Sequence, residues 1–179
     1  MVQHKINAYL TGEIIKSNTE EARNLKEKSS FGEFLGKNKD NVQYSFSEVL
    51  YLVENGKMDV YSLTGKEPLG FDKLFRKFRR ADKKIQIKYP VFKDLRDKGF
   101  IVKTALKFGA DFRVYDKGTR PGKSHAKWLV FAEHESSTNN WKDFSAKNRV
   151  AHSTRKKLLI AILDQEGDVL YYEVSWVKI

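Results

Sequence analysis

A tyrosine and a histidine flank one basic loop in the second half of the chain, and lysines lie in and around it. Tyr115 precedes the loop at 117–124 and His125 follows it, and the loop places glycines beside basic residues. That composition lets a backbone approach phosphate closely. RNA cleavage without a metal needs a base for the 2′-hydroxyl proton, an acid for the departing 5′-oxygen and a cation for the phosphorane charge. Tyrosine, histidine and lysine can supply these three groups.

The ordinary pKa values of these side chains suggest which role each type takes. Histidine, near 6.5, is the natural acid at neutral pH. A tyrosine hydroxyl, near 10, is a poor base unless neighbouring positive charge lowers its pKa. The candidates for that charge are Lys117, Arg120, Lys123, Lys127 and Lys156. A lysine beside the phosphate acts mainly through its charge, by stabilising a transition state more anionic than the substrate.

The composition favours a polyanionic partner. The chain has 34 lysines and arginines against 23 acidic residues, a formal net charge of +11 and a pI of about 9.6. Charge alone suits nucleic acid or an anionic membrane surface. However, the apolar runs, such as 158–163, are too short to span a bilayer, and the N-terminus lacks the pattern of a signal peptide. We therefore expect a cytoplasmic protein with no membrane partner.

The absence of cysteine restricts the chemistry further. It excludes disulfides, a thiolate nucleophile and a Cys-ligated zinc site, and the four histidines show no metal-ligand spacing. We expect neither a metal nor a cofactor.

The N-terminal half predicts a small α/β domain. Strands are expected on either side of the turn at 11–13, then a helix at 20–28 after Asn18 or Thr19, and this first piece reads as peripheral. Ser45 to Glu48 has the capping-box pattern of a helix that stops at 55–56. A strand at 58–63 precedes a helix at 71–78, whose apolar stripe lies under a basic face that is solvated or contacts RNA.

A charge-rich segment at 79–88 predicts the boundary between two domains, 1–84 and 85–179. In the second domain a helix is expected from near Pro90 to Gly99, followed by strands at 101–106, 111–115 and 126–131. A helix from Asn139 or Asn140 to Val150 and strands at 158–163 and 169–177 complete it, the last two joined by an acidic turn, Asp164 to Asp168. The predicted fold class is α/β, with a central mixed sheet in the second domain.

Spacing alone does not select a catalytic trio, since a basic chain offers many combinations of Tyr, His and Lys. The stretches RVYDKG, SHAKWLV and HSTRKKLLIAILDQEGD are more specific. Over roughly residues 85–179 they resemble the C-terminal catalytic domain of archaeal tRNA-splicing endonucleases, which has a restriction-endonuclease-like fold; the first half resembles that family's smaller N-terminal domain. By this resemblance Tyr115 is the general base, His125 the general acid and Lys156 the cation that stabilises the phosphorane.

The resemblance also implies a substrate, an assembly and further site residues. The family cuts precursor tRNA at bulge-helix-bulge sites without a metal, leaving 2′,3′-cyclic phosphate and 5′-hydroxyl ends. It implies that Arg149 and Trp176 contact an extrahelical base of the RNA. For a chain of this length it implies a homotetramer, in which the acidic turn docks on a basic cleft of a neighbouring subunit and the last strand pairs with a partner.

Plainer interpretations stay open for each residue and for the whole. Tyr115 could be a strand aromatic that packs on the sheet, His125 an ordinary loop histidine and Lys156 part of a solvated basic run. A metal-dependent nuclease is one alternative, although His125-Ala126-Lys127 puts no carboxylate at the start of the relevant strand. A non-catalytic RNA-binding subunit of a splicing endonuclease is the other.

Overall fold

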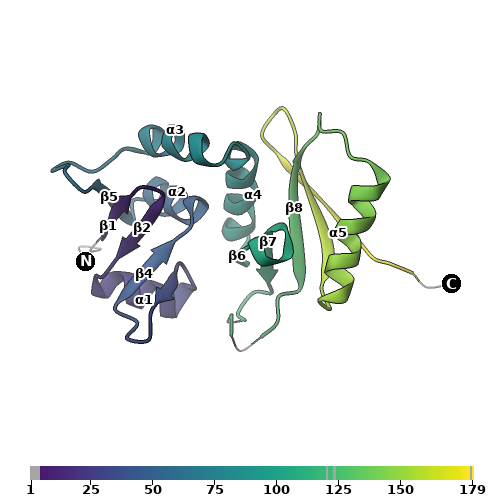
Figure 1. Cartoon of the computed structure of the whole chain (residues 1–179), viewed down its shortest axis with the longest axis horizontal. Helices are drawn as coiled ribbons and strands as arrows, with labels where there is room; N and C mark the ends of the chain where they lie inside the picture. The colour runs from purple at the N-terminus through teal and green to yellow at the C-terminus, as the bar shows by residue number, and fades with distance from the viewer. Residues whose placement is uncertain (1–4, 120, 123, 178) are drawn as a thin grey trace. The chain divides into compact units, whose positions relative to one another are not determined.

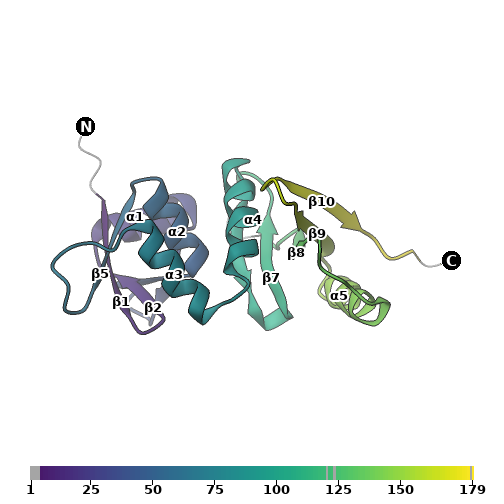
Figure 2. The same ribbon diagram turned by 90° about the horizontal axis from the view of Figure 1, so that it is seen from above.

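The computed structural model describes residues 5–119, 121–122, 124–177 and 179. The chain forms two compact units, and the division falls between Tyr89 and Pro90, inside helix α4 (Ile85–Asp97). Figures 1 and 2 show each unit with its own sheet. The domain boundary expected after residue 84 stays a prediction.

The first unit contains a five-stranded sheet in the order β3-β4-β2-β1-β5. Its strands are β1 (Ile6–Thr11), β2 (Ile14–Ser17), β3 (Glu33–Leu35), β4 (Asn41–Tyr44) and β5 (Met58–Ser62). Only the β1–β5 pair among these is parallel. The expectation that the first hairpin is peripheral was wrong, because β2 and β1 have strands on both sides. Ile6, Ala8 and Leu10 alternate with exposed residues, so one face of β1 is buried.

Two predicted helices begin at the expected caps. In α1 (Glu20–Ser29) the Thr19 hydroxyl accepts from the Ala22 N–H at 3.3 Å. In α2 (Phe46–Glu54) the capping box forms in full, because the Ser45 N–H donates to Glu48 Oε2 at 2.9 Å and the Glu48 N–H donates to the Ser45 hydroxyl at 3.4 Å. Glu48 Oε1 also accepts from the Gly32 N–H at 2.9 Å, which ties the helix start to the preceding loop.

Helix α3 (Phe71–Ala81) has the predicted apolar side, with Leu74 and Phe78 buried and Phe78 stacked on Phe46 at 4.3 Å between ring centroids. Its other side carries exposed basic residues.

The prediction that helix α4 starts near Pro90 was wrong, because the helix already begins at Ile85. Ile85 is buried, and the Tyr89 hydroxyl donates to Glu54 Oε2 at 2.6 Å. The Asp82 carboxylate accepts from the Lys84 N–H at 2.9 Å just before the helix. This packing and capping outweigh the backbone hydrogen bond that a proline inside a helix removes.

The second unit contains a mixed five-stranded sheet in the order β10-β9-β8-β7-β6. Its strands are β6 (Ile101–Ala105), β7 (Ala110–Tyr115), β8 (Trp128–His134), β9 (Lys157–Leu163) and β10 (Val169–Val174), with a 3₁₀ turn, η1 (Leu106–Phe108), before β7. Strands β8 and β9 are parallel, and the other pairs are antiparallel. All the predicted strands are present, although β8 starts later than residue 126 and β10 ends before residue 177.

Helices α4 and α5 (Trp141–Ser153) lie on opposite faces of this sheet (Figure 2). On one face Phe92 of α4 contacts Phe112 at 5.8 Å between ring centroids. On the other face Ala151 of α5 packs with Leu129 and Leu158 in a buried cluster. Across the described part of the chain, no helix is long and apolar enough to cross a membrane.

Candidate active site

The ends of three neighbouring strands bring Tyr115, His125 and Lys156 to one end of the second sheet. Tyr115 is the last residue of β7. The Lys127 N–H donates to the Val114 carbonyl at 2.8 Å, and the Lys157 N–H donates to the Lys127 carbonyl at 2.9 Å. The first bond joins the end of β7 to the segment that precedes β8, and the second joins that segment to the start of β9.

Tyr115 and Lys156 also share a face of the sheet. Arg113 on β7 pairs with Leu129 on β8, which in turn pairs with Leu158 on β9. The two leucines pack against α5. Because side chains alternate along a strand, Tyr115 lies on the face of Arg113, and Lys156 precedes Leu158 on that same face. The Tyr115 side chain is buried at 5% exposure. The sheet thus places the expected base and the expected cation on its α5 face.

The backbone and an aromatic ring hold the Lys156 side chain. Its Nζ donates to the Thr154 carbonyl at 2.8 Å and lies 5.1 Å from the centroid of the Phe108 ring. Burial lowers the pKa of Lys156, and the positive charges of Lys107 and Arg113 lower it further. The ammonium group therefore sits in an electropositive, half-buried place suited to a polyanionic ligand.

The same hydrogen bonds that end α5 also orient Lys156. Arg155 has a φ of 56°, in the left-handed region, and its N–H donates to the His152 carbonyl. The Lys156 N–H donates to the Ala151 carbonyl at 2.9 Å. This closure turns the chain from the helix directly into β9.

His125 differs from the other two residues, because it is exposed and lies in the segment that enters β8. No hydrogen bond joins the side chains of Tyr115, His125 and Lys156 to one another among the residues that the structure describes. The topology therefore brings the three backbone positions to one end of the sheet.

The other candidate cations in and beside the loop are engaged elsewhere or fall outside the description. Lys127 pairs with the Asp116 carboxylate at 3.2 Å and lies 4.2 Å from the centroid of the Trp128 ring. Lys117 lies over the Phe100 ring at 5.2 Å. Arg120 and Lys123 lie outside the described residues.

Arg149 and Trp176 lie around one hollow in the second unit. Its volume is about 270 Å³, and it is lined by Phe144, Ser145, Asn148, Arg149 and Trp176. Trp176 is 62% exposed, and its ring meets the His152 ring edge to face at 4.7 Å between centroids. The structure thus brings together, across α5 and the C-terminal segment, two residues that are distant in the sequence.

The acidic turn is held by its first residue. Asp164 Oδ1 accepts from the Glu166 N–H at 3.0 Å and from the Asp168 N–H at 2.8 Å, and Gly167 takes a φ of 93°. Glu166 and Asp168 are exposed. In the ranges that the structure covers, no group of three His, Asp or Glu residues is placed to hold a metal ion.

Sequence reasoning missed three residues that shape the surroundings of Lys156. They are Lys107, Phe108 and Arg113, which precede or lie within β7. Phe108 contacts Lys156 because η1 packs Phe108 against the α5-side cluster, whereas Lys107 and Arg113 act on Lys156 through their charge. A basic residue beside an aromatic one is too common in this chain to have indicated the contact.

Two sequence families match the two halves of the chain. The one described as tRNA intron endonuclease, N-terminal domain, matches residues 6–75, and the one described as tRNA intron endonuclease, catalytic C-terminal domain, matches residues 85–171. The fold and the matches together define a two-domain endonuclease.

Several archaeal proteins, each named tRNA-splicing endonuclease, are similar over most of their length. The protein of Pyrococcus abyssi is 41% identical over 174 residues, 97% of each chain, and that of Thermococcus onnurineus is 40% identical over 178 residues, 99% of each chain. The protein of Nanoarchaeum equitans is 41% identical over 145 residues, 78% of this chain and 92% of its own. This chain belongs to the tRNA intron endonuclease family, which confirms the resemblance and the predicted fold class.

Proposed function

We propose that the protein is a tRNA-splicing endonuclease that cuts precursor tRNA at bulge-helix-bulge sites by metal-independent transesterification. The observation that carries this proposal is the shared position of Tyr115 and Lys156 on one face at one end of the sheet, with His125 on the segment that enters β8. A base, an acid and a cation at one end of the sheet suit a transesterification in which the 2′-hydroxyl is deprotonated, the leaving 5′-oxygen is protonated and the phosphorane charge is stabilised.

In this mechanism Tyr115 takes the proton of the 2′-hydroxyl, and the 2′-oxygen attacks the adjacent phosphorus. The bond from phosphorus to the 5′-oxygen breaks, and His125 protonates that oxygen as it leaves. The products are a 2′,3′-cyclic phosphate and a 5′-hydroxyl, so no water is consumed. Lys156 offsets the extra negative charge of the phosphorane through its ammonium group.

The hollow lined by Arg149 and Trp176 suits an extrahelical base of the bulge. A guanidinium and an indole both stack on the face of a nucleobase regardless of its identity. Recognition of this kind reads the shape of the RNA, because A-form helices hide their base edges in a deep, narrow major groove.

We further propose a homotetramer in which the acidic turn docks on a neighbouring subunit. In support, Glu166 and Asp168 are exposed, and β10 is an edge strand with outward Leu170 and Tyr172, 52% and 57% exposed. Glu166→Gln with Asp168→Asn should therefore reduce the mass in sedimentation, while Asp164 keeps the turn folded. An unchanged mass would contradict the docking role. The cytoplasmic location stays a prediction.

A labelled RNA with two bulges separated by a short helix tests the activity. In excess EDTA, the wild type should give cyclic phosphate ends, whereas His125→Ala should lose most cleavage and keep its affinity for RNA. His134→Ala is the matched control, because His134 ends β8 and its ring contacts the Ser136 hydroxyl at 2.8 Å. Cleavage only after magnesium is restored would identify a metal-dependent nuclease. Tight binding without cleavage under both conditions would identify a recognition subunit.

A further inference from the structure

The first unit, which does not contain the catalytic residues, carries a strongly basic surface on helix α3. Five cations project from this helix, all exposed: Lys73, Arg76, Lys77, Arg79 and Arg80. Within the described residues, none of the five forms an ion pair with a carboxylate. We call these five residues with Lys83 the α3 basic surface.

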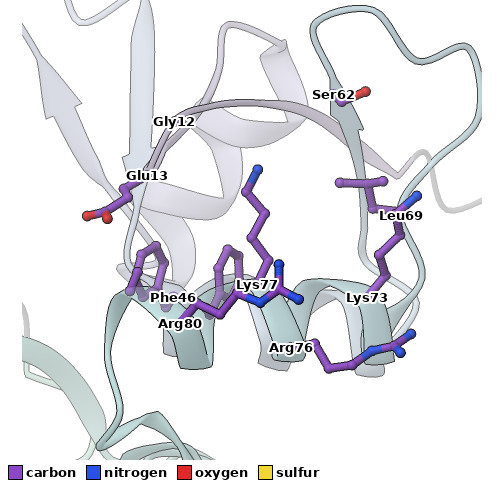
Figure 3. Close-up of a pocket in the computed structure, with 11 residues that line it drawn as sticks. Gly12, Glu13, Phe46, Ser62, Leu69, Lys73, Arg76, Lys77 and Arg80 are labelled. Carbon is purple, nitrogen blue, oxygen red and sulfur yellow. The ribbon is translucent and has the colours of Figure 1, made fainter.

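Two hollows adjoin the α3 basic surface. The larger, about 740 Å³, has cationic residues along α3 and an apolar floor that includes the partly exposed Phe46 and Leu69. Figure 3 shows Lys77 rising from α3 into this hollow, between Lys73 and Arg80. The second hollow, about 650 Å³, is lined by Arg76, Arg79, Arg80, Lys83 and Gln86.

Arg76 and Arg80 line both hollows, so the two form one continuous cationic path. A chain of regularly spaced anions could neutralise such a path along its whole length. The apolar floor beside it offers a contact for a base or ribose, as aromatic residues do in single-strand binding sites.

We propose that the α3 basic surface binds the phosphate backbone of an RNA strand, outside the unit that performs cleavage. The inference rests on the proposed function in taking RNA as the substrate, and it adds a second RNA contact, on the first unit. The cations supply affinity without sequence preference, because phosphates are the same at every nucleotide.

Other acidic partners fit this surface less well. The acidic turn of a second copy presents two exposed carboxylates, Glu166 and Asp168, and would leave most of the six cations unneutralised. Insertion of α3 into a membrane would require an apolar side of the helix that is free to enter the lipid, but Leu74 and Phe78 are buried in the protein core.

The test measures RNA affinity against salt concentration with the full chain. The variant Arg76→Gln, Lys77→Gln, Arg80→Gln removes three cations. The control Lys16→Gln, Lys28→Gln, Lys37→Gln removes the same charge from exposed positions of the same unit that line neither hollow. The probe is a bulge-helix-bulge RNA with 2′-deoxy nucleotides at the bulges, in EDTA, so that neither a metal nor a 2′-hydroxyl mechanism can cut it there.

We expect the variant to bind about tenfold or more weakly near physiological salt. The slope of log affinity against log salt should fall by about 2 to 3, since each phosphate contact contributes about 0.7 to 0.9. Lys77→Gln alone should lower the slope by about 1. The control should retain the wild-type slope.

Three results would overturn the inference: a wild-type affinity and slope in the variant, an equal loss in the control, or a smaller sedimenting mass of the variant without RNA. The last result would show that the surface binds another copy of the chain. Failure of the wild type to cut an all-ribose RNA would refute the proposed function alone, since this binding measurement does not depend on cleavage.

Discussion

Replacing Lys156 with methionine should slow cleavage strongly and leave the fold intact. Methionine is also unbranched and is only one heavy atom shorter, so it can still pack on the Phe108 ring, but it removes the charge and the hydrogen bond from Nζ to the Thr154 carbonyl. If Lys156 stabilises the phosphorane, the loss falls on the transition state. If Lys156 is only part of a basic surface, cleavage should hardly change.

The expected size of the kinetic effect follows from comparable losses elsewhere. Removing one preorganised donor to a developing oxyanion lowers kcat by about 10²- to 10³-fold, or about 2.7 to 4 kcal/mol. The effect on folding should be small. The lowered pKa of Lys156 means that the folded chain holds this cation less favourably than the unfolded chain does, so its removal offsets the lost hydrogen bond, worth about 1 kcal/mol.

Single-turnover cleavage and urea denaturation of the same preparations would measure both effects. Lys157→Met is the matched control, because Lys157 is the next residue, lies on the opposite face and pairs with Glu173 at 2.5 Å. The reasoning would be refuted if Lys156→Met cut RNA at the wild-type rate, or if it lost several kcal/mol of stability together with its activity.

Two other predictions concern charge near Lys156 and the anchoring of helix α2. The charge of Lys107 contributes to the lowered pKa of Lys156, so Lys107→Gln should raise that pKa and move the alkaline decline of cleavage to higher pH. An unchanged pH–rate profile would contradict the role of Lys107. Glu48→Ala should reduce the free energy of unfolding by about 2 kcal/mol or more, since it leaves the N–H groups of Gly32 and Ser45 without their acceptor. Chemical denaturation would test this second expectation, and a loss below about 0.5 kcal/mol would count against it.

Local signals in the sequence predicted the helices well where a cap was present. Ser45 with Glu48 and Asn140 before α5 both form the expected hydrogen bonds with backbone N–H groups. The start of α4 could not be predicted in this way, because it depends on burying Ile85 and Tyr89 rather than on the local preference of Pro90. The central place of β1 was hidden for a similar reason, since its parallel partner β5 lies far along the chain.

The candidate site, like the fold, could be predicted only in part from the sequence. Tyr115 and His125 flank a loop that the sequence makes visible, and motif resemblance supplied Lys156. The surroundings of Lys156 could be identified only from the structure, because Phe108 is distant from Lys156 in the sequence and contacts it only where η1 packs against the α5-side cluster. Arg149 and Trp176 similarly meet only once the C-terminal segment passes α5.

The pairing of β7, β8 and β9 limits where residues can be inserted without moving Tyr115 or Lys156. One residue inserted within β7 would turn Tyr115 toward the α4 face and away from Lys156, since side chains reverse faces with each step of register. Residues inserted at 117–124 would leave both in place and alter only the approach of His125. Backbone hydrogen bonds thus fix the positions of the proposed base, Tyr115, and the proposed cation, Lys156, whereas the length of the loop sets the position of the proposed acid, His125.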